Sequence, residues 1–303
     1  MTTTTAPTDP GTRQTDVPQR TIRAGARRRR PRRPLRWVIL AAAVLIALVM
    51  LAPLVLLVLN AFKTGTDYSA HGPLAFPTTW SLQSFQDYLD RVDFLRALWN
   101  SVVISTLVAL LGTLVSLLSA YAIGVGRVRG STALLAVFLL ATMLPQEALI
   151  YPLFYGAQAT GTFNTVWSVV IVFTVLQAAF GTYLLSSVMS TLPPSLLEAA
   201  ALDGAGRWRI LWSVVYPVMR PTLSVLMVFF FVWTWNEFYI PLILLSDQSV
   251  QTVPIALATL QGQNSIDITS LNAGSLLSLL PTLVFFIIFQ RTLSRGVTVG
   301  SVK

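Results

Sequence analysis

Six long apolar blocks, separated by short polar stretches, are the feature that most limits how this chain of 303 residues can fold. A membrane helix needs about 20 residues to cross the roughly 30 Å hydrocarbon core of a bilayer. Five blocks have about that length, and the sixth reaches it with its apolar flanks. Their approximate bounds are 37–59, 102–123, 132–154, 166–187, 222–243 and 275–289. We therefore predict an all-α, polytopic membrane protein with six transmembrane helices.

Composition argues against several other classes of protein. With 54% hydrophobic and 11% charged residues, the chain is too apolar for a soluble domain of its length. It has no cysteine, and its one histidine, His71, cannot by itself form a zinc site or a Ser-His-Asp triad. A membrane-embedded enzyme would need a convergent catalytic cluster, and the sequence has no pattern of that kind. We accordingly expect no metal, no cofactor and no catalytic residues.

The net charge of +9 is explained by membrane topology better than by binding to nucleic acid. Ten of the 21 Lys and Arg residues lie in the first 36 positions, directly before the first apolar block. With six spans, the segments on the side of both termini hold 18 basic residues, and the opposite segments hold only Lys63, Arg91 and Arg96. Cytoplasmic loops carry an excess of Lys and Arg, so we predict that both termini are cytoplasmic. Residues 1–36 are expected to form a disordered, Arg-rich tail before a membrane domain of residues 37–303.

The first external segment combines loop with a short helix. Apolar residues recur at helical spacing between positions 81 and 100, namely Phe85, Tyr88, Leu89, Val92 and Leu95. We expect this helix to lie along the outer interface of the membrane. The pattern leaves two roles open, a simple connector or a docking surface for an external partner.

A second short helix is predicted in the polar loop between the fourth and fifth blocks, over about residues 195–206. Ser195 and Glu198 have the spacing of a capping box, in which each side chain accepts a hydrogen bond from a backbone amide of the first turn. Good helix formers follow, and Gly204 can take the left-handed conformation that ends a helix. On physical grounds alone the segment is equally a docking element or a plain connection between two spans.

This loop resembles the cytoplasmic loop of ATP-binding cassette (ABC) importer permeases, whose pattern is Glu-Ala-Ala, three residues, Gly, nine residues, Ile, one residue, Leu-Pro. Here Glu198-Ala199-Ala200, Gly204, Val214 and Tyr216-Pro217 keep every spacing, with Val and Tyr in place of Ile and Leu. The run from Glu198 to Ala205 is similar to carbohydrate-uptake permeases of the maltose transporter type, the second, shorter permease of the pair. The resemblance extends from about residue 37 to the C-terminus through Asn100-Ser101, Ala120-Tyr121-Ala122, Trp235-Asn236-Glu237-Phe238 and Gly300-Ser301-Val302-Lys303.

The resemblance implies the ABC importer type I permease fold and a place in the bacterial cytoplasmic membrane. It implies four kinds of partner: a second, similar permease, two ABC ATPase subunits, an extracytoplasmic solute-binding protein, and a sugar or oligosaccharide as substrate. It also implies that the short helix couples the ATPase to the spans, through Glu198, Ala199, Ala200, Asp203, Gly204 and Ala205.

The chain itself carries no ATP-binding motif, because a P-loop needs a lysine after a Gly-rich turn and neither Lys63 nor Lys303 follows one. We therefore expect a partner subunit to hydrolyse ATP. Two alternatives stay open: a permease for another small polar solute, and an ion-coupled transporter or channel. The latter is supported only by Glu147 and Glu237 within predicted spans.

Polar residues inside the third and fifth spans predict a solute pathway. Counted from the expected cytoplasmic ends near Thr132 and Thr222, Glu147 and Glu237 each lie about 15 residues in, which places both carboxylates at about 22 Å depth. Trp233 precedes Glu237 by one turn and could stack on a sugar. The same polar groups could instead bond neighbouring spans together. The predicted pathway residues are Gln146, Glu147, Trp233, Asn236 and Glu237.

Overall fold

The computed structural model describes residue 2 and residues 33–126, 128–261 and 267–299. Every regular element in those ranges is helical. The chain divides into two compact units, residues 1–51 and 52–303. Most of the predicted N-terminal tail, and the family-like C-terminal residues Gly300 to Lys303, lie outside the described residues, so their predictions remain untested.

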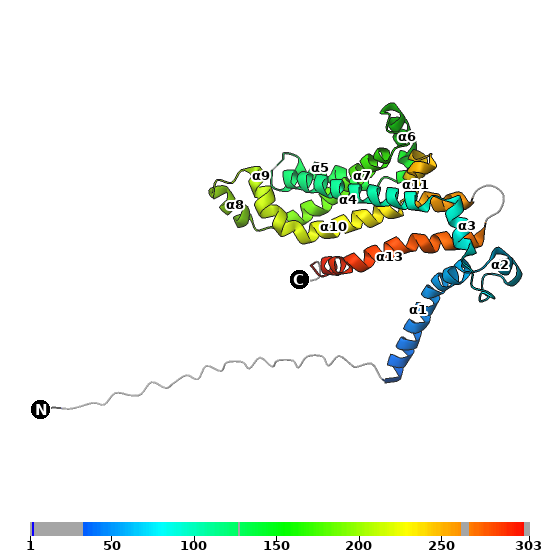
Figure 1. Cartoon of the computed structure of the whole chain (residues 1–303). Helices are drawn as coiled ribbons and strands as arrows, with labels where there is room; N and C mark the ends of the chain where they lie inside the picture. Colours follow the sequence, from blue (N-terminus) through cyan, green and yellow to red (C-terminus); the bar gives the residue numbers. More distant parts are fainter. Residues whose placement is uncertain (1, 3–32, 127, 262–266, 300–303) are drawn as a thin grey trace. The chain divides into compact units, whose positions relative to one another are not determined.

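The helices follow the chain in this order (Figure 1): α1 Arg33–Ala61, α2 Gly65–His71, α3 Gln83–Arg91, α4 Phe94–Gly124, α5 Ser131–Thr142, α6 Ile150–Ala159, α7 Val166–Met189, α8 Pro194–Leu202, α9 Arg207–Ile210, α10 Tyr216–Asn236, α11 Tyr239–Leu244, α12 Val253–Ala258 and α13 Ile268–Val299. A 3₁₀ turn, η1 Gln146–Leu149, leads into α6, and a π-helical turn, η2 Leu211–Val215, joins α9 to α10.

Five helices of the described chain are long and apolar enough to cross a membrane, and a bent pair makes a sixth when it is counted as one span. The five are Arg36–Ala61, Phe94–Gly124, Val166–Met189, Arg207–Asn236 and Ile268–Gln290. The predicted all-α membrane fold is therefore confirmed. Between the first two spans, the helical pattern of residues 81–100 divides into α3 and the start of α4, because Asp93 caps α4 through its side chain.

Helices α4, α7 and α10 form the centre of the second unit and lie side by side in Figure 1. Their close approach depends on small residues. A Cβ atom added to Gly181 of α7 would lie 2.8 Å from the Cβ of Ser116 and 2.9 Å from a ring carbon of Phe230. Small side chains at helix crossings let backbones approach closely, which is how membrane helices gain packing energy where water no longer drives association.

The third predicted span is not one straight helix. Helix α5 ends at Thr142, and the segment from Gln146 to Ala159 continues at 94° to it. Pro145 explains the break, because it lacks an amide proton and its ring clashes with the carbonyl four residues earlier, that of Ala141. The span predicted over 132–154 is therefore present as a bent pair of helical segments.

The fifth span also differs from its prediction. It begins at Arg207 instead of Thr222 and ends at Asn236 instead of Ile243. At its far end, Pro241 of α11 has no amide proton to donate to the Glu237 carbonyl, and the backbone of Glu237 is extended, with ψ 137°. At its near end, the π-helical turn Leu211–Val215 comes just before Pro217. Because Pro217 has no amide proton, the regular helical hydrogen bonding is interrupted there. Glu237 therefore lies at the end of the helix and not inside the span as predicted.

Candidate functional site

Helix α8 lies at one end of the bundle, beside α9 (Figure 1), in the loop predicted to couple to an ATPase. It begins at Pro194, with Pro193 as the extended N-cap residue, and no side chain caps it. The predicted capping box was wrong. Proline suits the first helical position because its missing amide costs nothing there, so the helix begins one residue early and Ser195 falls inside the first turn.

The C-terminal end of α8 forms a Schellman motif. The amide of Gly204 donates to the carbonyl of Ala201, and that of Ala205 to the carbonyl of Ala200, each at 3.0 Å. Gly204 has a φ of +73°, the left-handed conformation predicted for it. No atom beyond its two chain neighbours lies within 4 Å of a Cβ atom built at Gly204, so a side chain would have room there. Glycine is favoured at this position because of its left-handed backbone conformation.

One side of this segment packs on the bundle and the other is exposed. Leu197, Ala200 and Ala205 contact the buried core that α4, α7 and α10 share. The Tyr121 hydroxyl, at the end of α4, donates to the Arg207 carbonyl at 2.8 Å and fixes the start of α9. Opposite them Leu202 is 89% exposed. The exposed residues among those predicted to couple are Glu198, Ala199, Asp203 and Gly204.

A polar cluster forms where the break of the third span meets the end of α10. The Trp233 indole nitrogen donates to Oε1 of Glu237 at 2.9 Å. The side chains of Gln146 and Glu147, from the break of the third span, lie close to this carboxyl group. The two breaks thus bring together four of the five predicted pathway residues, from segments about 90 positions apart in the chain. Phe180 and Phe229 meet the Trp233 ring edge to face, with centroids 6.2 and 5.7 Å away.

Asn236 is the pathway candidate that stands apart from this cluster. Its amide nitrogen donates to the Val232 carbonyl of its own helix at 2.7 Å, and the residue is exposed. Glu147 is also exposed, whereas Gln146, Trp233 and Glu237 are half-buried. The cluster therefore presents one exposed carboxylate and an aromatic ring that packs edge to face with two others.

Sequence analysis missed Gln177, a buried residue of α7 next to this region. Its amide nitrogen donates to the Thr234 hydroxyl at 2.8 Å, and its side-chain oxygen is buried with no partner among the described residues. A lone Gln in the middle of the fourth apolar block was the available signal. The bond ties α7 to the turn of α10 that carries Trp233 and Glu237.

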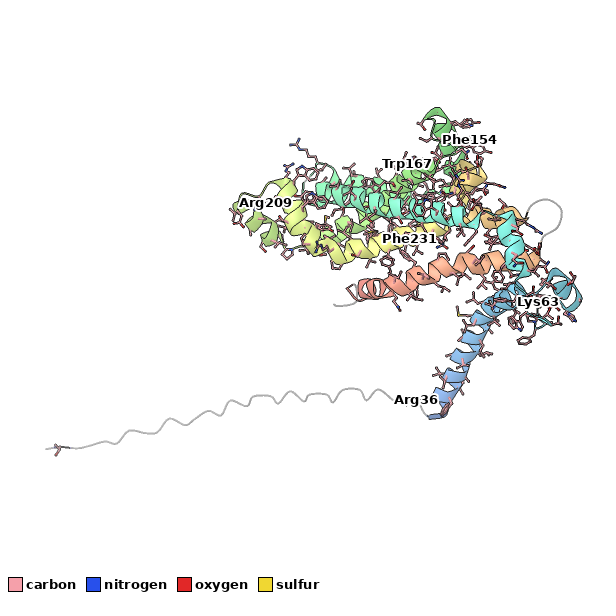
Figure 2. All side chains as sticks on the ribbon, viewed as in Figure 1. Arg36, Lys63, Phe154, Trp167, Arg209 and Phe231 are labelled. Carbon is pink, nitrogen blue, oxygen red and sulfur yellow. The ribbon has the colours of Figure 1, made fainter. Side chains whose placement is uncertain are left out.

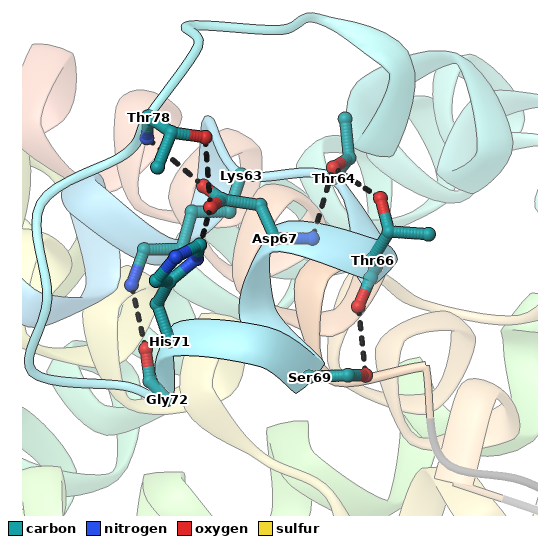
Figure 3. A network of polar contacts seen from close by, with 9 residues as sticks. Lys63, Thr64, Thr66, Asp67, Ser69, His71, Gly72 and Thr78 are labelled. Carbon is teal, nitrogen blue, oxygen red and sulfur yellow. Dashed lines mark hydrogen bonds and ion pairs between the residues drawn. The ribbon is translucent and has the colours of Figure 1, made fainter.

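A separate polar network holds the segment after α1 (Figure 3). The Asp67 carboxylate accepts hydrogen bonds from the Thr78 amide at 3.1 Å and hydroxyl at 2.9 Å, and pairs with His71 Nδ1 at 2.9 Å. Burial alone would raise the pKa of Asp67, but these bonds together hold that pKa below its usual value. Lys63 is fully buried and donates to the Gly72 carbonyl at 2.8 Å, at the C-terminal end of α2. The network is a structural clasp, because each bond joins two parts of this one segment.

Comparison with known proteins places these features in a family. Residues 112–299 match the family model described as binding-protein-dependent transport system inner membrane component. The chain is 32% identical to the arabinooligosaccharides transport system permease protein AraQ of Halalkalibacterium halodurans, over 89% of this chain and 97% of that one. It is 27% identical to the melibiose/raffinose/stachyose import permease protein MelC of Bacillus subtilis, over 88% and 96% of the two chains.

The fold has a counterpart of known structure. A chain of a bacterial ABC transporter involved in the import of the acidic polysaccharide alginate superposes with a TM-score of 0.74. The match covers 86% of this chain and 98% of that one, at 19% sequence identity. The helices of this chain are therefore arranged as in that chain of the alginate transporter.

Proposed function

The chain belongs to the family of binding-protein-dependent transport system inner membrane components, and from this premise we propose that it forms part of the translocation channel of an ABC importer for a sugar or oligosaccharide. Three of the relatives are named for the import or transport of melibiose, raffinose and stachyose, of arabinooligosaccharides, and of lactose. In this proposal the channel is completed by a second, similar permease. Two ATPase subunits drive it, and an extracytoplasmic solute-binding protein delivers the sugar. Both termini and α8 lie on the cytoplasmic side, as the distribution of Lys and Arg favours.

The single observation that carries the proposal is the exposed α8 turn. The segment packs against the bundle on one side, through Leu197, Ala200 and Ala205, and is exposed on the other. A partner that binds the exposed side and moves can therefore displace the spans. The Schellman motif fixes the angle between α8 and α9, and α9 runs through the π-helical turn into α10. Movement of an ATPase against α8 would in this way reach Trp233 and Glu237 at the other end of the same helical run.

The polar cluster is the proposed contact with substrate. Glu147 offers an open carboxylate to sugar hydroxyls, and the Trp233 ring offers an apolar face of the kind on which sugar C–H groups stack. Asn236 is exposed but is bonded to its own helix, so we expect it to contribute less to this contact. An ion-coupled transporter could use the same carboxylates, but it would not need a helix that docks an ATPase. The exposed α8 turn therefore favours the ABC permease.

The decisive experiment separates docking of the ATPase from folding of the chain. Leu202→Asp places a charge on a residue that is 89% exposed, so the bundle should stay folded while ATPase subunits no longer copurify from membranes. Leu74→Asp is the matched control, because Leu74 is 74% exposed and follows α2, far along the chain from α8. ATPase retained by the Leu202 variant, or lost equally by both, would contradict the proposal.

A further inference from the structure

After their breaks, the third and fifth spans each continue into a short helix, and the two short helices meet at the end of the bundle opposite α8 (Figure 1). The third span continues into α6 and the fifth into α11. The two helices pack against each other, with Ala157 of α6 and Ile240 and Leu244 of α11 buried in one apolar core. Gln146 lies just before α6 and Glu237 just before α11, so the packing of these helices helps to set how close the two side chains come.

Helix α11 is too short to hold its position by itself. It has six residues, and no side chain caps its start. Helices of fewer than about 12 residues are marginal in isolation, because forming the first turn costs more than its one hydrogen bond returns. The place of α11, and with it that of Glu237, therefore depends on contacts with other parts of the chain.

One residue, Asn164 in the turn between α6 and α7, ties the far end of α11 to the far end of α6. Its amide donates to the Leu244 carbonyl at 2.9 Å, the last carbonyl of α11, which has no partner inside that helix. Its side-chain oxygen accepts the Asp247 amide at 2.8 Å. The turn is itself fixed to α6, because the amides of the two residues before Asn164 both donate to the Ala157 carbonyl, at 3.0 and 3.1 Å.

The backbone of Asn164 distinguishes it from its neighbours. In the described part of the chain it is the one residue other than glycine with a positive φ, +59°. Asparagine tolerates this left-handed conformation better than most residues, and unlike glycine it also has a side-chain oxygen that can accept a hydrogen bond. A non-glycine residue persists in this conformation where its surroundings fix it, and such residues gather at functional sites.

We propose that Asn164 is a positioning residue for the solute site: by joining the far ends of α6 and α11, it holds Gln146 and Glu237 near each other. Figure 2 labels Phe154 of α6 and Trp167 of α7 at this end of the bundle. The inference rests on the proposed function, because a sugar is the solute whose binding it concerns. Asn164 acts through Glu237 and makes no contact with the sugar itself.

Hydrogen exchange of the full-length chain, without partners, tests the contact. In Asn164→Ala the amides of residues 239–247 should exchange at least about fivefold faster, the change in population that strain in the left-handed region gives. Asn164→Gly keeps the backbone conformation and should have a smaller effect. Gly161→Ala is the matched control, because Gly161 lies in the same turn with φ +69° and has nothing within 4 Å of its Cβ position, but does not bond to α11. No acceleration in Asn164→Ala, or an equal one in Gly161→Ala, would overturn the proposal.

Uptake of labelled sugar by the assembled complex tests the function. Asn164→Ala should raise the KM about fivefold while the ATPase still copurifies, and Gly161→Ala should leave the KM unchanged. Because Asn164 acts through Glu237, combining Asn164→Ala with Glu237→Gln should raise the KM by less than the product of the two single effects. An unchanged KM in Asn164→Ala, or effects that multiply fully, would refute the positioning role alone. No uptake of any saccharide by the unaltered complex would instead refute the proposed function, and with it a role of Asn164 in sugar binding.

Discussion

The left-handed turn at Gly204 gives the sharpest test of how α8 works. A residue with a Cβ atom in this conformation is disfavoured by roughly 1–2 kcal/mol, which corresponds to a change of about 5- to 30-fold in the population of the turn. Folding of the bundle should be unaffected, because no neighbouring atom meets the new Cβ and the turn is exposed. If the ATPase binds only the turn as observed, its apparent affinity falls by up to the same factor.

A series of substitutions separates the backbone effect from a steric one. Asn tolerates the left-handed conformation better than Ala, although its side chain is larger. We therefore expect the affinity for the ATPase to fall in the order Gly204, Gly204→Asn, Gly204→Ala. Gly206→Ala is the matched control, because Gly206 has an ordinary φ of −67° and nothing within 4 Å of its Cβ position.

The assay is titration of ATPase subunits onto the permease in nanodiscs, with the melting temperature of each variant measured alongside. Uptake of labelled sugar, per ATP hydrolysed, then reports coupling. A larger loss for Asn than for Ala would show that bulk in a docking groove matters, and the backbone explanation would be abandoned. Equal losses for Gly204→Ala and Gly206→Ala would show that α8 does not depend on this turn at all.

Three further predictions concern packing, the solute pathway and pH. Gly181→Ala should lower the stability of the bundle by about 1–3 kcal/mol through overpacking, whereas Gly156→Ala, with nothing near its Cβ position, should not, as thermal unfolding in detergent will show. Trp233→Ala and Glu147→Gln should raise the KM for sugar uptake by about five- to tenfold in complexes that still hydrolyse ATP, and Asn236→Ala should change it less; an unchanged KM in all three would leave these residues only a structural role. Because the pKa of Asp67 is lowered in the folded chain, its hydrogen bonds should be intact above pH 3.8 and should be lost as the pH falls through the lower pKa of the folded state. Hydrogen exchange of residues 62–82 should show this opening in the native chain. In Asp67→Asn the exchange rates should no longer depend on pH in this way.

The outline of the molecule follows from local chemistry that is legible in the sequence. Runs of apolar residues must be helical in a membrane because each backbone amide has to be bonded within its own segment. The left-handed turn at Gly204 follows from the freedom of glycine and the helix formers before it. Both depend on residues near one another in the chain, and the structure confirms both.

The contacts between residues that are far apart in the sequence were decided by the tertiary structure. The prolines at positions 145 and 241 show that helices weaken there, but not where the chain turns afterwards, since a bend of 94° depends on the helices packed around it. The contact of Gln146 with Glu237 depends on that turn. The bond from Gln177 to Thr234 depends on how closely α7 packs on α10, which the absence of a side chain at Gly181 permits. Such contacts join residues far apart in the sequence, and no local preference specifies them; only the packed bundle fixes their partners.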